Sequence, residues 1–158
     1  RIRNGRNMRL TAEVTGKLDS RRSCDALLYA PLGQSLTFLR SRLYSLSGNG
    51  PNERAEGFVS EVLFDPISQN LSLTGDPVHG DAFFILDYGI KPGALDLEKE
   101  AILRYYQGLD DPGFLLEDLQ LRQRLYVFGD SNEAERAREI FVRDIVNPAI
   151  HVWNFSHV

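Results

Sequence analysis

Apolar and polar residues alternate along residues 8–18 (MRLTAEVTGKL). Leu10, Ala12, Val14 and Leu18 fall on one side, and charged or hydroxyl-bearing residues fall on the other. Successive side chains of a strand point to opposite faces, so this pattern predicts a strand with one face in water. A second apolar run over 24–30 ends at Pro31, and we expect it to pair with the first as a hairpin.

The apolar period lengthens after residue 35. Leu36, Leu39, Leu43 and Leu46 are spaced three, four and three residues apart, which places them on one helical stripe. Gly48 is well placed to end such a helix. We therefore predict a helix over 35–47, followed by a loop over 47–54.

Strands are predicted again from residue 57 to residue 90. Phe58, Val62 and Phe64 lead into a turn at Asp65-Pro66, and an alternating segment returns over 71–74. The run 82–86 (AFFIL) has the length and composition of a buried strand. Short connections favour antiparallel pairing, because parallel strands need a long crossover.

The segment after residue 95 predicts three helices. Asp96 caps the first, which ends near Gln107, and good helix formers fill a second over 113–128. The last three residues of that second segment (YVF) favour a strand, but we expect Arg124–Phe128 to be helical. A third helix is predicted over 131–147, where Pro148 ends it.

These elements predict an α+β fold, with a mostly antiparallel sheet from the N-terminal half packed by about three helices from the C-terminal half. The length of 158 residues fits one domain over 8–158, preceded by a flexible basic tail over 1–7. No internal repeat is evident in the sequence.

Charge is distributed unevenly, although the net charge is only −4. Residues 1–54 carry ten basic and four acidic groups, whereas residues 55–158 carry eight basic and eighteen acidic groups. One interpretation is nucleic-acid binding through the arginine-rich segment Arg1–Arg54, since guanidinium groups bind phosphate well. The alternative is a solvated polar face, because no recognition motif accompanies the charge.

The cysteine and histidine residues favour neither a disulfide nor a metal centre. Cys24 is the only cysteine, which suits a reducing compartment, and we expect a cytoplasmic protein. His79, His151 and His157 lack metal-ligand spacing, so we expect no metal and no cofactor. No apolar run approaches the roughly 18 residues of a membrane span.

A possible nucleophile stands in Gly129-Asp130-Ser131, which follows an apolar run. Asp76-Pro77-Val78-His79 and Gly48-Asn49-Gly50 complete a set of three blocks that resembles the SGNH (GDSL-type) esterases and lipases. The resemblance implies a serine hydrolase in which Ser131 attacks, His79 takes its proton and Asp76 orients the imidazole. The order departs from that family, where the serine block comes first.

A second interpretation of Gly-Asp-Ser involves no catalysis. Gly129 supplies the residue that ends one helix, and Asp130 or Ser131 caps the next. Glu133, three residues after Asp130, completes a capping-box spacing.

The chain end is apolar and aromatic, with Trp153, Phe155 and Val158 close together. These residues either cover the core or form a surface for a protein partner or a second copy of the chain. Our leading interpretation is a non-enzymatic interaction or regulatory module, such as a small acidic binding protein, an inhibitor or a chaperone-like protein. The serine hydrolase and the nucleic-acid-binding protein are the alternatives.

Overall fold

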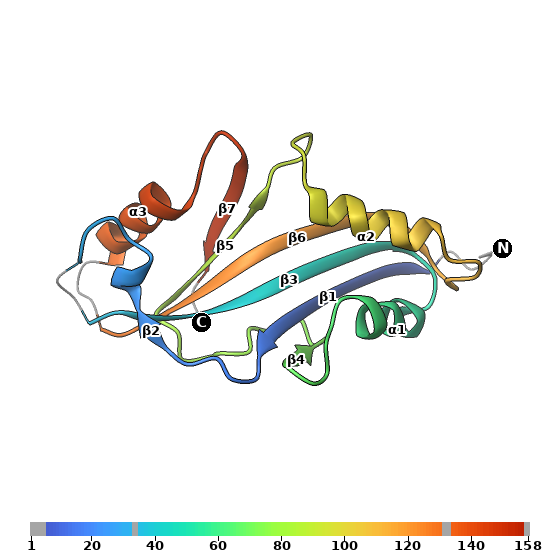
Figure 1. Ribbon diagram of the computed structural model, residues 1–158, viewed down its shortest axis with the longest axis horizontal. Coiled ribbons are helices and arrows are strands. Elements are labelled where there is room, and N and C mark those ends of the chain that lie inside the picture. Colours follow the sequence, from blue (N-terminus) through green and yellow to red (C-terminus); the bar gives the residue numbers. More distant parts are fainter. Residues whose placement is uncertain (1–5, 33–34, 131–133, 157–158) are drawn as a thin grey trace.

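The computed structural model describes residues 6–32, 35–130 and 134–156 (Figure 1). It has the predicted α+β class, with one seven-stranded sheet in which every pairing is antiparallel. The strands are β1 (Asn7–Gly16), β2 (Arg22–Ser23), β3 (Thr37–Asn49), β4 (Gln69–Ser72), β5 (Phe84–Ile90), β6 (Leu115–Phe128) and β7 (His151–Ser156). Their order across the sheet is β4-β1-β3-β6-β5-β7, and β2 pairs with β3.

The helices are α1 (Asn52–Val62), α2 (Leu97–Gln107) and α3 (Ala134–Ile145), together with the short 3-10 helix η1 (Cys24–Ala26). The α2 helix begins at its predicted cap, where the Asp96 carboxylate accepts a hydrogen bond from the Lys99 N–H at 3.1 Å. No helix in the described part of the chain is long and apolar enough to cross a membrane.

Two predicted helices are strands. Residues 35–47 belong largely to β3, and residues 113–128 belong to β6, so the helix expected at Arg124–Phe128 is wrong. The cause is burial on both faces: β3 buries Phe38, Tyr44 and Leu46 on one face and Leu43 on the other. A strand covered on both sides loses the alternation that identifies a strand with one wet face.

Two predicted strands are not strands. The segment beginning at residue 57 lies mostly in α1, where Ala55, Phe58 and Val59 are buried at helical spacing. The run 24–30 forms η1 and turns, and only the two-residue β2 pairs there with β3. The strands predicted over 8–18 and 82–86 are confirmed in position by β1 and β5.

The sheet consists of two topologically equivalent halves, which the sequence did not reveal. The order β1, β3, α1, β4 is repeated as β5, β6, α3, β7, and in each half the helix connects two strands that flank the first strand. The halves meet where β3 pairs with β6. If Glu13 on Leu43 corresponds to Asp87 on Arg124, then Arg42 corresponds to Gln123, and because these two residues pair with each other, a pseudo-two-fold axis passes through this pair.

Equivalent positions follow from the register of the strands. Glu13 of β1 pairs with Leu43, and Asp87 of β5 pairs with Arg124, which places these two acids at the same position of the two halves. Two lysines repeat the relation: Lys17 Nζ donates to the Pro66 carbonyl at 2.6 Å, and Lys91 Nζ donates to the Pro148 carbonyl at 3.4 Å.

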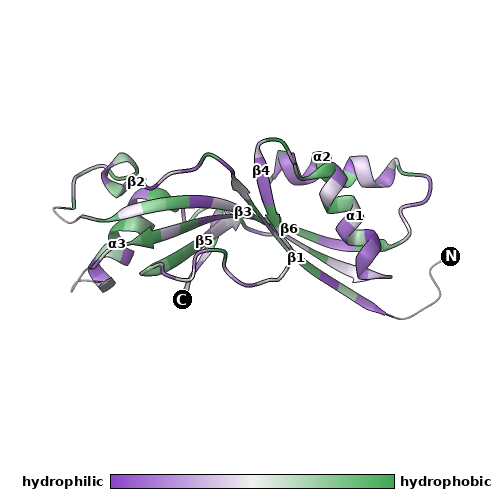
Figure 2. Cartoon of the chain, turned by 90° about the horizontal axis from the view of Figure 1, so that it is seen from below, coloured by the Kyte–Doolittle hydropathy of each residue, from purple (hydrophilic) through white to green (hydrophobic). Residues whose placement is uncertain are grey.

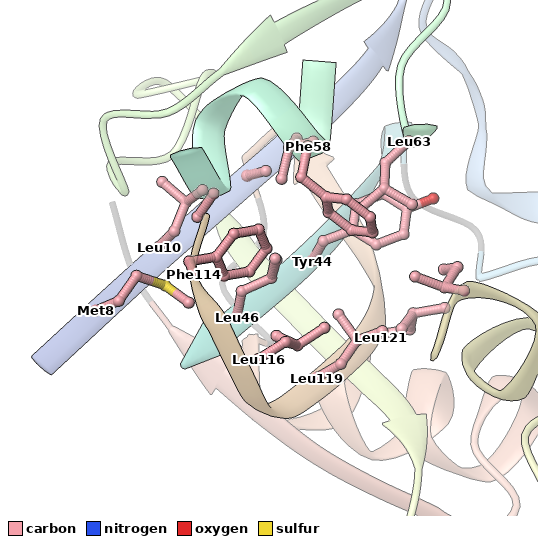
Figure 3. Close-up of a cluster of buried hydrophobic side chains, with 14 of the residues drawn as sticks. Met8, Leu10, Tyr44, Leu46, Phe58, Leu63, Phe114, Leu116, Leu119 and Leu121 are labelled. Atoms are coloured by element: carbon pink, nitrogen blue, oxygen red, sulfur yellow. The ribbon is translucent and has the colours of Figure 1, made fainter. Parts of the chain in front are cut away.

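The helices lie at the two ends of the long sheet, as Figures 1 and 2 show, and the apolar core is divided between these ends. At one end α1 and α2 cover β1, β3 and the first part of β6, and Figure 3 shows the buried side chains of this cluster. At the other end α3 and the segment around η1 cover β5 and the last part of β6. The segment that follows the first strand of each half therefore covers the other half: η1, after β1, packs on β5 and β6, and α2, after β5, packs on β1 and β3.

Candidate functional site

The side of the sheet opposite these two clusters carries a buried group of charged and hydroxyl-bearing side chains, which we call the charge cluster. It comes from four neighbouring strands and consists of Glu13, Ser41, Asp87, Arg124 and Tyr126. The side chains of Arg124, Glu13 and Asp87 are only 12%, 4% and 8% exposed. The two equivalent acids of the two halves thus share one arginine.

Arg124 holds the charge cluster together. Its Nε and Nη2 donate to the two oxygens of Asp87 at 2.7 and 2.9 Å, and its Nη1 donates to Glu13 Oε1 at 3.0 Å. The other oxygen of Glu13 accepts from Ser41 Oγ at 2.7 Å and from the Tyr126 hydroxyl. Every carboxylate oxygen has a donor, which buried charges require if they are not to destabilise the fold.

The environment shifts two pKa values in this cluster. Burial opposes the charge of Arg124, but the hydrogen bonds and the charge of Asp87 outweigh it and raise the Arg124 pKa above its ordinary value. Burial, and then the hydrogen bond donated to Glu13, raises the pKa of Tyr126 to about 12. At neutral pH Arg124 is therefore charged and Tyr126 is a neutral donor.

The segment between β4 and β5 covers one side of this cluster. The Val78 N–H donates to the Tyr126 hydroxyl at 3.0 Å, and the His79 ring lies edge-on to the Tyr126 ring at 4.7 Å. Arg21 stacks on Phe128 at 3.7 Å and forms an ion pair with Asp81 at 2.7 Å. His79 thus packs as an aromatic side chain over the charge cluster.

The charge cluster is only weakly indicated by the sequence pattern. Glu13 belongs to the side of the alternating strand that we assigned to water, and Asp87 directly follows the apolar run of a buried strand. An acidic residue directly after a buried apolar run is the only feature of the sequence pattern that indicates a buried charge here. The pairing of both acids with Arg124 depends on strand register, which the sequence pattern does not specify.

The residues of the predicted serine hydrolase are only partly described. Asp76 is exposed and His79 is half-buried, and no hydrogen bond joins these two described side chains. Ser131 lies outside the described residues, as does Glu133 of the alternative capping box. Strand β6 continues to Phe128, so the interpretation of Gly129 as the end of a helix is wrong, and α3 begins at Ala134. Gly129 directly follows β6 and adopts a positive φ of 127°.

The arginines of the predicted nucleic-acid surface are dispersed. Arg21 is paired with Asp81, and Arg42 is paired with Glu98 at 2.5 Å. Arg22 and Arg40 are exposed and lie on the Phe38 ring at 5.9 and 5.7 Å. Arg1 and Arg3 lie outside the described residues. Among the side chains that are described, no group of three or more His, Cys, Asp or Glu residues is placed to hold a metal ion.

The predicted interaction residues divide between core and surface. Phe155 is half-buried and its ring lies edge-on to Phe84 at 5.6 Å, so it covers the core. Trp153 is 39% exposed on β7, next to Val152 at 37% and Ile150 at 40%. Val158 lies outside the described residues. Strand β7 is the last strand of the sheet on its side, so one of its edges has no neighbouring strand in the described chain.

No family model, curated protein or solved structure matches this chain.

Proposed function

We propose that the chain is a non-enzymatic interaction module that associates with a second copy of itself through the open edge of β7. The observation that carries the proposal is the chemistry of this edge. Edge strands are commonly protected by lysine, proline, bulges or shortness, because their free N–H and C=O groups can pair with another chain. The six residues of β7 (HVWNFS) contain no lysine and no proline, and they pair with β5 without a register shift.

The backbone of Trp153 faces the open edge. In an antiparallel pair, residues that exchange hydrogen bonds alternate with residues whose N–H and C=O point away from the partner strand. The Lys91 N–H donates to the Ile150 carbonyl at 2.8 Å, which fixes this alternation at the start of β7. Trp153, an odd number of residues beyond Ile150, therefore presents its N–H and C=O outward.

A second copy of the chain suits this edge in two ways. Strand β7 carries no Asp, Glu, Lys or Arg, so two β7 strands can approach without bringing like charges together, although each chain carries a net charge of −4. The fold also contains the same kind of contact, since β3 and β6 of the two equivalent halves pair antiparallel about the pseudo-two-fold axis. Two β7 strands that pair antiparallel about a true two-fold axis would form the same kind of contact between two chains.

Light scattering on the eluting protein tests the proposal. The native chain of 17.9 kDa is expected to elute with twice that mass. Trp153→Lys places a charge on the edge and removes a large apolar group, and we expect it to weaken the dimer by about 2 kcal/mol, roughly 30-fold. Asn70→Lys puts the same charge on the opposite edge strand β4 and is expected to leave the mass unchanged. A native monomer, or equal effects of both variants, would contradict the proposal.

The serine hydrolase remains the second candidate, because Ser131 falls in the sequence between the end of strand β6 at Phe128 and the start of helix α3 at Ala134, and the resemblance implies a nucleophilic serine between a strand and a helix. The antiparallel sheet counts against the hydrolase, because the resemblance implies alternating strands and helices with parallel pairing. It therefore favours the non-enzymatic proposal. We expect a fluorophosphonate probe not to label the protein. Labelling that disappears in Ser131→Ala would replace the interaction module with a hydrolase.

A further inference from the structure

A hollow of about 300 Å³ lies where β5 and β6 separate, and we call it the α2 pocket. Their pairing ends at Tyr88 and Gln123, after which β5 leads into the loop before α2 and leaves the earlier part of β6 without a neighbour on that side. The walls come from the end of β5, the loop, the start of α2, the middle of β6 and Val152 of β7. The hollow lies at the lower end of the size range of small-molecule pockets.

Three cationic side chains line the α2 pocket, and none of them forms an ion pair with a described residue. Arg122 donates only to neutral oxygens, those of Asn154 at 3.2 Å and Gln120 at 3.4 Å. Lys91 donates to the Pro148 carbonyl, and the Lys99 ammonium has no hydrogen-bond partner in the described chain. This contrasts with Arg124, which binds two carboxylates only two residues further along β6.

Two acids also line the α2 pocket, but neither neutralises these cations directly. Asp96 accepts the Lys99 N–H and so caps α2, and Asp118 accepts from Gln120 Nε2 at 3.5 Å. The charged lining residues sum to +1, from three cations and two acids, within a segment that carries eight basic and eighteen acidic groups. The local field therefore favours an anion.

Apolar side chains form the rest of the wall, among them Ile90, Pro92, Leu121 and Val152. A few polar groups set in apolar walls are typical of sites for small organic ligands. The other half of the sheet does not repeat the site, because the position equivalent to Arg122 is Ser41. Arg122 is thus a feature of one half only, whereas Lys91 repeats the Lys17–Pro66 contact.

We propose that the α2 pocket binds a small organic anion whose phosphate or carboxylate group lies between Lys99 and Arg122, with its apolar part against Leu121 and Val152. This binding is independent of the proposed association through β7, because the backbone that forms the open edge does not line the pocket.

Titration calorimetry with glycerol 3-phosphate and with succinate separates the two possible anionic groups, phosphate and carboxylate. We expect saturable binding of at least one probe. In Lys99→Gln and in Arg122→Gln the affinity is expected to fall about 10-fold or more, because a charge-assisted hydrogen bond contributes more free energy than a tenfold change in affinity represents. Lys17→Gln, which removes the equivalent of Lys91 outside the pocket, is the matched control and is expected to change affinity less than twofold.

Thermal melting of each variant verifies that it is folded before the titration. Binding of neither probe would overturn the proposal. Binding that persists in folded Lys99→Gln and Arg122→Gln would also overturn it, because the anion would then lie elsewhere, for example on the exposed arginines beside Phe38.

Discussion

Arg124 is the residue on which the centre of the sheet depends. It neutralises Asp87 and Glu13 from the two halves, and all three side chains are largely buried. Arg124→Met keeps the apolar stem but leaves two buried carboxylates without a cation. We expect the free energy of unfolding to fall by about 3–5 kcal/mol, the usual cost of breaking a buried ion pair from one side.

Arg122→Met is the matched control for this loss of stability. It lies two residues earlier on β6 and bonds only to neutral side chains, so we expect a change below about 1 kcal/mol. Urea denaturation of both variants measures the difference. Equal losses would show that Arg124 contributes no more than an ordinary arginine of this strand.

The ionisation of the buried Cys24 thiol is expected to make the free energy of unfolding depend on pH in the alkaline range. Burial, and then the charge of Asp25, raises its pKa from 9.0 to about 12. As pH rises above 9, the unfolded chain releases this proton before the folded chain does, so the contribution to stability is complete below pH 9 and is lost by about pH 12.

We therefore expect the stability difference between the native chain and Cys24→Ala to be constant below pH 8 and to shrink as pH rises to 12. The measurement is the urea midpoint of both proteins across that range. A difference that stays constant up to pH 12 would mean that the thiol ionises equally easily in both states.

At the scale of single elements, two glycines have opposite roles. Gly57 lies in the exposed part of α1, where an added Cβ would meet nothing within 4 Å. Gly57→Ala is expected to raise the free energy of unfolding by about 0.5–1 kcal/mol, because alanine is the better helix former.

Gly48 lies at the bulge between β3 and β6, where an added Cβ would come within 1.9 Å of the Leu115 carbonyl oxygen. Gly48→Ala is therefore expected to lower stability by about 1–3 kcal/mol. Thermal or urea unfolding of the two glycine variants gives the signs directly. A stabilised Gly48→Ala would mean that the strands do not approach so closely.

The same scale shows which elements the sequence could predict. Strand β1 and helix α2 were predictable, because one face of β1 alternates with polar residues and Asp96 caps α2. Strands β3 and β6 were not, because they lie at the centre of the sheet and bury side chains on both faces. The spacing of Leu36, Leu39, Leu43 and Leu46 then matched a helix, although Leu39 and Leu43 lie on one face of β3, Leu46 lies on the other, and Leu36 precedes the strand.

At the scale of the whole molecule, the two equivalent halves determine three features that the sequence did not predict: the strand order, the charge cluster and the position of Trp153 on an edge strand. The halves are related by strand order and register, and their connections differ in structure: η1 stands in one half where α2 stands in the other. The charge cluster forms only because the strand register brings Glu13 of β1 and Asp87 of β5 within reach of the same arginine of β6, Arg124. The Trp153 region was predicted as a possible contact surface, but its position on an edge strand follows only from the topology.

The open edge of β7 is tested most directly by amide hydrogen exchange at Trp153, followed at low and at high protein concentration. If two chains pair through β7, the outward N–H of Trp153 enters an intermolecular hydrogen bond, and its exchange slows as concentration rises. The Asn70 amide on the opposite edge strand is expected to exchange at a rate independent of concentration. A Trp153 amide that exchanges equally fast at both concentrations would contradict the proposed association.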